Sequence, residues 1–174
     1  GEGRSRTDLG LPGVQQELLE EIFKVNKNIV LVLNNGRPLT INWADENIPS
    51  IVEAWQLGTQ SGNAIAEVLY GDYNPSGKLP MTFPRNVGQV PLYYNHKNTG
   101  RPNLPESKNV FWSHYNDVEN TPLYPFGYGL SYTTFEYGTI KTTKSFDLDQ
   151  KITVSVAVTN TGKRKGKEVV QLYI

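Results

Sequence analysis

The residues best suited to acid–base chemistry stand at the start of the chain, where one glutamate between two glycines is followed by two arginines. Glu2 lies between Gly1 and Gly3, so the local backbone has little steric constraint and the carboxyl group can reach over the mouth of a site. Arg4 and Arg6 could orient that carboxylate or contact substrate hydroxyls. An exposed glutamate in a frayed terminal loop would show the same pattern, so the residues alone leave both interpretations open.

A second set of candidate residues lies in an aromatic-rich loop that contains Trp112, His114 and Tyr115. Flat aromatic rings can stack on the flat faces of ligands, and this makes Trp112 a candidate substrate contact. Aromatic residues at this density also form small satellite cores, which is the alternative interpretation.

The sequence does not indicate metal, nucleotide or thiol chemistry. His96 and His114 are far apart and have no flanking ligand pattern, and the chain has no cysteine and no glycine-rich phosphate loop. The segment that starts at Asp72 matches the first positions of an EF-hand loop, but its twelfth position is Phe83, which favours a rigid turn over a calcium site. We therefore expect no metal and no cofactor.

Charge and hydropathy exclude two further classes of partner. Seventeen basic residues balance seventeen acidic ones and neither sign forms a long run, so we expect no nucleic acid and no membrane surface as partner. No apolar run reaches the ~18 residues that span a bilayer, and the first residues lack the apolar core of a signal peptide. The chain begins without methionine and ends within a strand-like pattern, so we expect a piece of a longer protein.

The spacing of apolar residues in the first third predicts a helix followed by two buried strands. The helix is expected over 12–25, where glutamates face outward and apolar residues recur at helical spacing: Leu11, Val14, Leu18, Ile22 and Val25. Continuous apolar runs over 28–34 and 50–55 predict strands buried on both faces, as in a parallel sheet. Between them we expect an extended piece that reaches about Trp43.

The stretch 58–84 predicts a second helix and a rigid turn. Ser61 can cap the helix, and Gly71 can end it in the left-handed conformation. A short extended segment follows over 79–83, and residues 85–124 lack sustained periodicity, which predicts a long excursion over the surface.

Beyond residue 134 the pattern changes to alternating polar and apolar residues. This alternation predicts strands over 135–141, 152–158 and 168–174, each with one face in water, and a turn at 160–162.

Two motifs carry a family resemblance that covers nearly the whole chain. The segments 58–84 (GTQSGNAIAEVLYGDYNPSGKLPMTFP) and 125–135 (PFGYGLSYTTF) resemble the C-terminal α/β domain of glycoside hydrolase family 3, the β-glucosidase and β-xylosidase family, and in particular its bacterial periplasmic β-glucosidases. The resemblance implies an α/β fold: a layered sandwich with a mostly parallel sheet flanked by helices over 1–134, whose N-terminal part is missing. A truncated, antiparallel fibronectin type III-like β-sandwich would follow over 135–174.

The same resemblance implies a division of catalytic roles. Residues 1–8 followed by Leu11 and Pro12 resemble the loop that carries the acid/base glutamate in many members, which places Glu2 at that position. The aspartate nucleophile of the family lies on a separate N-terminal barrel domain, so that barrel is an expected partner from the same parent chain. Glycoside hydrolysis needs both carboxyl groups, and this chain alone is therefore expected to be inactive.

The resemblance also implies a substrate and a location. The parent protein is expected to be an exo-acting, retaining β-glucosidase in the periplasm or secreted, acting on a β-linked oligosaccharide or glucoside, and a homodimer is compatible with this. A β-xylosidase or another exo-glycosidase of the family is the nearest alternative. A structural or interaction module without catalytic activity is the alternative from another class.

Overall fold

The computed structural model describes residues 3–102, 110–143, 145, 147 and 149–174. The chain forms two compact units, one made of Gly1–Ser61 with Leu79–Tyr128 and the other of Gly62–Lys78 with Gly129–Ile174. The domain boundary expected after residue 134 stays a prediction, because a compact unit need not coincide with a family domain. Among the described residues, no helix is long and apolar enough to cross a membrane.

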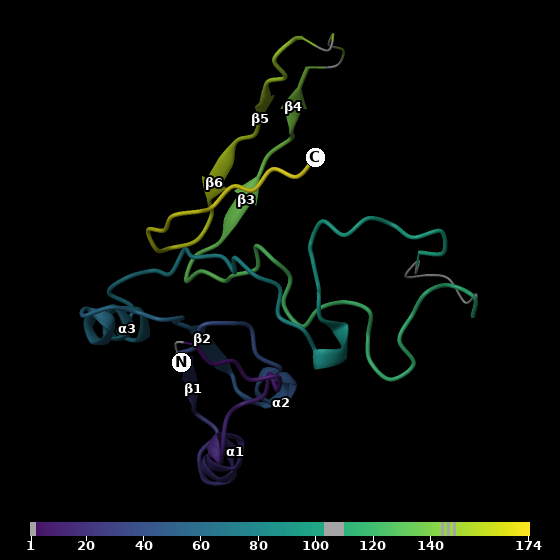
Figure 1. Ribbon diagram of the computed structural model, residues 1–174. Coiled ribbons are helices and arrows are strands. Elements are labelled where there is room, and N and C mark those ends of the chain that lie inside the picture. Colours follow the sequence, from purple (N-terminus) through teal and green to yellow (C-terminus); the bar gives the residue numbers. More distant parts are fainter. Residues whose placement is uncertain (1–2, 103–109, 144, 146, 148) are drawn as a thin grey trace. The chain divides into compact units, whose positions relative to one another are not determined.

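A pair of parallel strands forms the centre of the first unit. Strand β1 (Val30–Leu33) pairs with β2 (Ser50–Glu53), with Val30 opposite Ser50 and Leu33 opposite Glu53 (Figure 1). Both strands lie inside the apolar runs that predicted them, and each is shorter than its run. Parallel strands joined through helical segments confirm the α/β class.

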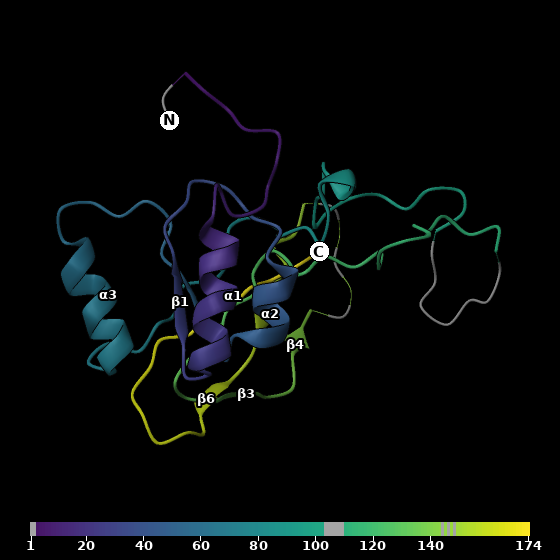
Figure 2. The same ribbon diagram turned by 90° about the horizontal axis from the view of Figure 1, so that it is seen from below.

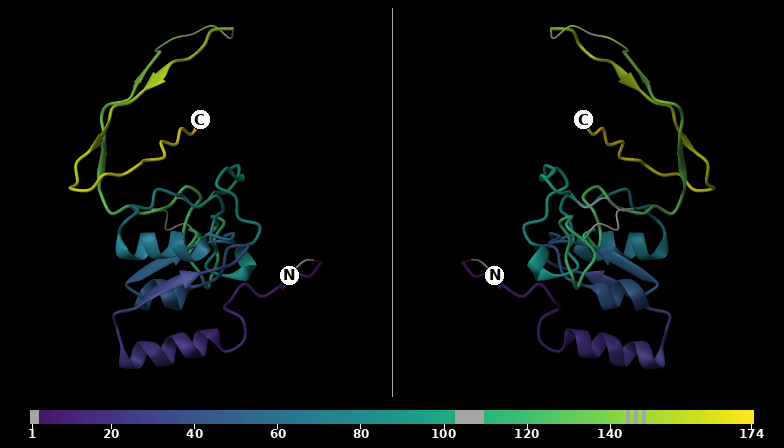
Figure 3. Two further views of the ribbon diagram at one scale, coloured as in Figure 1. Left: turned by 90° about the vertical axis from the view of Figure 1, so that its left-hand side faces the viewer. Right: turned by 90° about the vertical axis from the view of Figure 1, so that its right-hand side faces the viewer.

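Helix α1 (Gln15–Val25) lies against one face of this strand pair (Figure 3). It begins later than predicted because Gly13 has a positive φ of 58°, which a helix cannot continue through. The face of α1 that packs on the core carries Leu19 and Phe23, and the predicted inward stripe is wrong: Val25 is 85% exposed. The helix has two apolar stripes, and spacing alone cannot tell which one meets the core.

Helix α2 (Asn42–Asn47) was not predicted, and it takes over the end of the extended piece expected up to about Trp43. Residues 38–41, before the helix, are not helical. Four of the six residues of α2 are asparagine, aspartate or tryptophan, which have only moderate helix propensity, and so short a helix is marginal in water. Packing therefore has to stabilise it. Ala44 is buried, and the Trp43 ring meets the Phe23 ring edge-on with centroids 5.5 Å apart.

The segment 79–83 runs antiparallel to residues 123–128, as an extended segment can, but it bends at Pro80 and Met81 between its paired ends. The Phe83 N–H donates to the Tyr124 carbonyl at 2.8 Å, and the Phe83 side chain is 1% exposed. The Phe83 ring meets the rings of Trp55 and Tyr124 at centroid distances of 5.9 and 6.0 Å. Segment 79–83 is thereby fixed beside the end of β2.

The excursion over 85–124 contains one regular element among its described residues, the 3₁₀ helix η1 (Val87–Gln89) (Figure 2). Gln89 is buried, and its side-chain amide donates to the Glu119 carbonyl at 2.8 Å while its oxygen accepts the Arg85 N–H at 2.7 Å. These bonds join the start of the excursion to its end.

The second unit begins at Gly62, within α3 (Ser61–Tyr70). Ser61 is the first helical residue, so the helix begins one position earlier than a cap at Ser61 would imply. Gly71 ends the helix with φ of 80°, as predicted.

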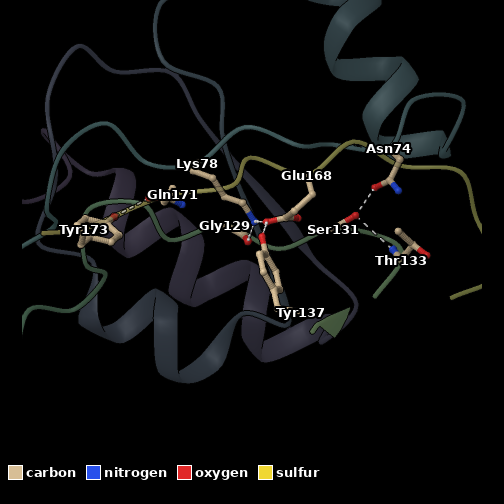
Figure 4. Close-up of polar contacts among 9 residues, drawn as sticks. All are labelled: Asn74, Lys78, Gly129, Ser131, Thr133, Tyr137, Glu168, Gln171 and Tyr173. Carbon is tan, nitrogen blue, oxygen red and sulfur yellow. Dashed lines mark hydrogen bonds and ion pairs between the residues drawn. The ribbon is translucent and has the colours of Figure 1, made fainter. Parts of the chain in front are cut away.

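The turn after α3 is held by its own asparagine. The Asn74 Oδ1 accepts bonds from the Ser131 hydroxyl at 2.9 Å and the Tyr132 N–H at 2.8 Å, and the Asn74 Nδ2 donates to the Lys165 carbonyl at 3.0 Å (Figure 4). Both polar atoms of the Asn74 side chain bond to other parts of the protein. The segment is therefore described as a rigid turn.

The tail forms a long, interrupted antiparallel hairpin. Its strands are β3 (Phe135–Tyr137), β4 (Lys141–Thr142), β5 (Val154–Ser155) and β6 (Val158–Asn160), with β3 paired to β6 and β4 to β5 (Figures 1 and 3). The strand predicted over 168–174 is wrong for this structure, since the segment carries no ladder pairing. A sequence that alternates polar and apolar residues forms a β-strand only where a neighbouring strand supplies its backbone hydrogen-bond partners.

A polar cluster in the second unit joins the turn to the hairpin (Figure 4). The Lys78 ammonium donates to the Gly129 carbonyl at 2.7 Å and pairs with the Glu168 carboxylate at 3.4 Å, with both charged side chains 15% exposed. The Tyr137 hydroxyl donates to the same carboxylate at 3.2 Å. One carboxylate therefore holds partners from the turn and from β3.

We expect Glu168→Gln to destabilise the hairpin by about 1.5–3 kcal/mol, because it removes charge-assisted bonds from a mostly buried site. The measurement is amide hydrogen exchange in β3 and β6, which should become faster. Glu136→Gln, on the exposed side of β3, is the matched control and should leave exchange unchanged. Equal exchange in the two variants would contradict this role for Glu168.

Candidate active site

The carboxyl ends of β1 and β2 lie at one edge of the strand pair, because the strands are parallel. The loop 34–37 follows β1 and the loop 54–56 follows β2. These loops approach so closely that a Cβ at Gly36 would lie 3.0 Å from Gln56 Nε2. Ligands of open α/β sheets bind at this edge, which makes it the place to look for chemistry.

Glu53, the last residue of β2, is the central carboxylate of this edge. Its Oε1 accepts the Trp55 N–H at 2.9 Å, and its Oε2 accepts the Asn35 Nδ2 at 3.2 Å. The same Asn35 nitrogen donates to the Arg37 carbonyl at 2.7 Å. A carboxylate on one strand end is thus linked through an amide to the loop after the other strand.

Glu53 is partly buried, and this changes its acidity. Burial raises the pKa of Glu53 above its ordinary value of 4.5, while the hydrogen bonds from Trp55 and Asn35 oppose the shift. The Asn35 Oδ1 is a buried acceptor without a hydrogen-bond partner among the described residues. Both features cost folding free energy, so this edge is not arranged for stability alone.

The backbone at Trp55 is strained. Trp55 has a φ of 52°, a left-handed conformation that costs about 1–3 kcal/mol in a bulky residue. The bond to Glu53 and the edge contact with Phe83 hold it there. Strain of this kind is common at functional sites, and here it turns the chain sharply at the end of β2.

The N-terminal loop is built onto the segment that follows β1. The Thr40 N–H donates to the Leu9 carbonyl at 2.9 Å, which fixes the loop before α1. Arg37 extends the attachment: its guanidinium donates to the Ser5 hydroxyl and to the Asp8 carbonyl, each at 3.4 Å.

Within the loop, Arg6 folds back on its own chain. Its guanidinium donates to the Gly10 carbonyl at 2.7 Å and to the Asp8 carbonyl at 3.3 Å, while the Asp8 carboxylate accepts the Gly10 N–H at 2.7 Å. Arg4 is exposed to solvent. Glu2, the predicted acid/base, lies outside the described residues, so its role stays a prediction.

Trp112 lines a surface hollow of about 480 Å³ together with Gly100, Arg101 and Phe111. The Ser113 N–H donates to the Arg101 carbonyl at 2.9 Å, which joins the two sides of this loop. A half-buried indole beside a guanidinium can stack on an apolar ring face and donate hydrogen bonds to its hydroxyls.

The predicted site residues are not all brought together. No hydrogen bond or ion pair within the described part of the chain joins Trp112 to Arg4 or Arg6. The two histidines form no ligand set either, since no cluster of at least three His, Cys, Asp or Glu residues suited to a metal occurs among the described residues.

Sequence reasoning missed Asn35, Arg37 and Glu53. The signal for Glu53 was present, because a charged residue at the end of an otherwise apolar run, Ile51-Val52-Glu53-Ala54-Trp55, is costly unless it has partners. The pairing of Asn35 with that residue was not readable, since it depends on the register of two strands.

Comparison with known proteins shows the family to which the sequence is similar. The profile described as "Glycosyl hydrolase family 3 C-terminal domain" matches residues 1–132. The chain is 53% identical to the periplasmic β-glucosidase of Salmonella typhimurium over 174 residues, which is 99% of this chain and 23% of that protein. It is also 53% identical to a β-xylosidase of Formosa agariphila, covering all of this chain and 23% of that one.

A solved structure shows the same fold. The β-glucosidase of Listeria innocua in complex with isofagomine matches with a TM-score of 0.87 at 43% identity, over 92% of this chain and 22% of that one. The chain therefore spans about a quarter of the length of the curated relatives named above.

We expect Glu53 to make stability depend on pH. Because the folded pKa of Glu53 is raised, the folded state binds its proton more tightly, and the contribution of Glu53 falls as pH rises from about 4.5 through the folded pKa. Glu53→Gln removes this titration, so the urea midpoint of the wild type relative to the variant should decrease over that range. Urea unfolding of both proteins from about pH 4 to about pH 7 measures this.

Glu119 is exposed, and its backbone carbonyl, which the substitution does not change, accepts the bond from Gln89. Glu119→Gln in the same unit is therefore the control variant. A difference between wild type and Glu53→Gln that is independent of pH would contradict a raised pKa for Glu53.

Proposed function

This chain belongs to glycosyl hydrolase family 3, and on that premise we propose that the protein carrying it is an exo-acting β-glucosidase that hydrolyses terminal β-glucosides with retention. The observation that carries the proposal is the 53% identity to a β-glucosidase along essentially the full chain. A β-xylosidase is the second candidate, because the identity to a β-xylosidase is the same. Relative kcat/KM for an aryl β-glucoside and the matching β-xyloside decides between them.

We assign to this chain the acid/base half of a two-carboxylate site, with Glu2 as the acid. In the first step the carboxylic acid gives its proton to the glycosidic oxygen as the C–O bond breaks, while a nucleophilic aspartate bonds to the anomeric carbon. In the second step the resulting carboxylate takes a proton from water, whose oxygen displaces the aspartate. The aspartate belongs to a barrel domain outside this chain.

The attachment of the N-terminal loop at the sheet edge supports this assignment. Leu9 is fixed by a backbone bond to Thr40, beside the loop that follows β1. A short loop on a rigid support is a suitable carrier for a group that must be placed within about 0.5 Å.

We further propose that the substrate contacts come from two places. Trp112 stacks on a sugar ring at the hollow that it shares with Arg101. Arg4 is placed in solvent and is free to contact a hydroxyl, whereas Arg6, with its guanidinium on two backbone carbonyls, shapes the loop as well as offering its remaining donors to substrate.

The remaining architecture follows from the same premise. The two parallel strands belong to a larger layered sandwich that other parts of the protein complete, and the hairpin of the tail is the start of a fibronectin type III-like domain. A periplasmic or secreted location agrees with the relative from Salmonella, whose name includes the periplasm.

In the full-length enzyme, Glu2→Gln should lower kcat/KM by roughly 10²–10⁴ for glucosides with poor leaving groups and far less for activated aryl glucosides. Only the poor leaving groups need a proton in the transition state. The measurement is a series of aryl glucosides ordered by the pKa of the phenol. An equal loss across the series would remove Glu2 from the acid position.

This chain on its own should not hydrolyse glycosides. It carries the acid/base and lacks the nucleophile, so the covalent intermediate that divides the reaction into two easier steps cannot form. Purified chain and full-length enzyme should be assayed side by side with an aryl β-glucoside. Turnover by the isolated chain at a rate near that of the full-length enzyme would refute the division of roles.

A further inference from the structure

We propose that Arg37 is a positioning residue for the acid/base loop, held in place by Asn35 and Glu53 at the sheet edge. The inference rests on the proposed function, because it takes Glu2 as the group that the loop carries. It adds three residues to the site, none of which is assumed to touch substrate.

The guanidinium of Arg37 provides the contact with the loop. It reaches two points on the loop at once, the Ser5 hydroxyl and the Asp8 carbonyl, both at 3.4 Å. Three residues of extended chain span at most ~11 Å, so an anchor at Ser5 limits how far a catalytic group at position 2 can move.

The backbone of Arg37 is fixed from the opposite side. The Arg37 carbonyl accepts the Asn35 Nδ2 at 2.7 Å, and that nitrogen also donates to Glu53 Oε2 at 3.2 Å. Glu53 in turn accepts the Trp55 N–H at 2.9 Å. The anchor of the loop is thereby joined to the end of β2 at Glu53 and to the loop that follows β1 at Asn35.

The costs of this arrangement argue for a role in function. Glu53 is partly buried with a raised pKa, Trp55 is left-handed, and Asn35 has a buried carbonyl oxygen without a hydrogen-bond partner among the described residues. Apolar residues of similar size at positions 35 and 53 would avoid the burial of a carboxylate and of an unbonded amide oxygen, and a glycine at position 55 would avoid the backbone strain. Such costs are retained where they fix a geometry that function needs.

An arginine suits this task better than a lysine. Its planar fork presents several donors in fixed directions and can contact acceptors on two residues together, whereas an ammonium group is a single point of charge on a flexible stem. Arg37→Lys therefore keeps the charge and loses the double contact.

The experiment is a double-mutant cycle in the full-length enzyme, measured as kcat/KM for a poor and an activated leaving group. Arg37→Ala should lower the value for the poor leaving group by about 10- to 100-fold and the value for the activated aryl glucoside by less than about threefold. Arg37→Lys should show the same imbalance, and it carries the test if the alanine variant does not fold. Asn35→Ala should also lower kcat/KM more for the poor leaving group than for the activated one.

The variant with both Arg37→Ala and Glu2→Gln decides whether Arg37 acts through Glu2. If it does, the double variant should be no slower on the poor leaving group than Glu2→Gln alone. Lys24→Ala on the exposed side of α1 removes the same charge and should leave both substrates unchanged.

Each other outcome overturns the inference. Equal losses on both substrates for Arg37→Ala would show a general structural role, and additive losses in the double variant would show an action independent of Glu2. If Glu2→Gln itself shows no imbalance between leaving groups, the proposed acid is wrong and the inference falls with it, so the two failures are distinguishable.

Discussion

The burial of Phe83 is the constraint on which the first unit depends. Its ring lies against Trp55 and Tyr124, and its backbone pairs with Tyr124, so three distant parts of the chain meet at one side chain. Burying a phenylalanine contributes roughly 1.5–3 kcal/mol, enough to offset the strain of a left-handed tryptophan. The sharp turn after β2 therefore depends on a residue some thirty positions away, in the motif Leu-Pro-Met-Thr-Phe-Pro.

That meeting point also explains how a long excursion can leave the first unit and return to it. Residues 85–122 leave and return beside Phe83, where Gln89 bonds to Glu119 and Arg85 donates to Thr121. Closing a long loop at its base costs little more than closing a short one, because the entropy grows only with the logarithm of length. Trp112 lies outside the hydrophobic core, so a change at this position should not disturb the packing around Phe83.

The sequence predicted those parts of the fold that depend on local spacing. Strands β1 and β2, helix α3 and its end at Gly71 follow from apolar runs and one glycine. Helix α2 and the inward face of α1 were missed, since both depend on which surfaces meet in space. The candidate site divides in the same way: Glu2, Arg4, Arg6 and Trp112 came from motif and residue type, whereas the link between Asn35 and Glu53 exists only once two strands are in register.

A two-carboxylate mechanism divided between a loop and a separate domain places an unusual demand on the loop. Retaining chemistry needs the two carboxyl groups about 5–5.5 Å apart, and a glycine-flanked glutamate cannot fix that separation by its own backbone. The separation must come from what holds the loop. In this chain a series of hydrogen bonds runs from Glu53 at the end of β2 through Asn35 to the Arg37 carbonyl, and the Arg37 guanidinium bonds to the loop at Ser5. We propose that this series supplies the support. Under the proposed assignment of Glu2, the carboxyl group and the support of its loop therefore come from different residues.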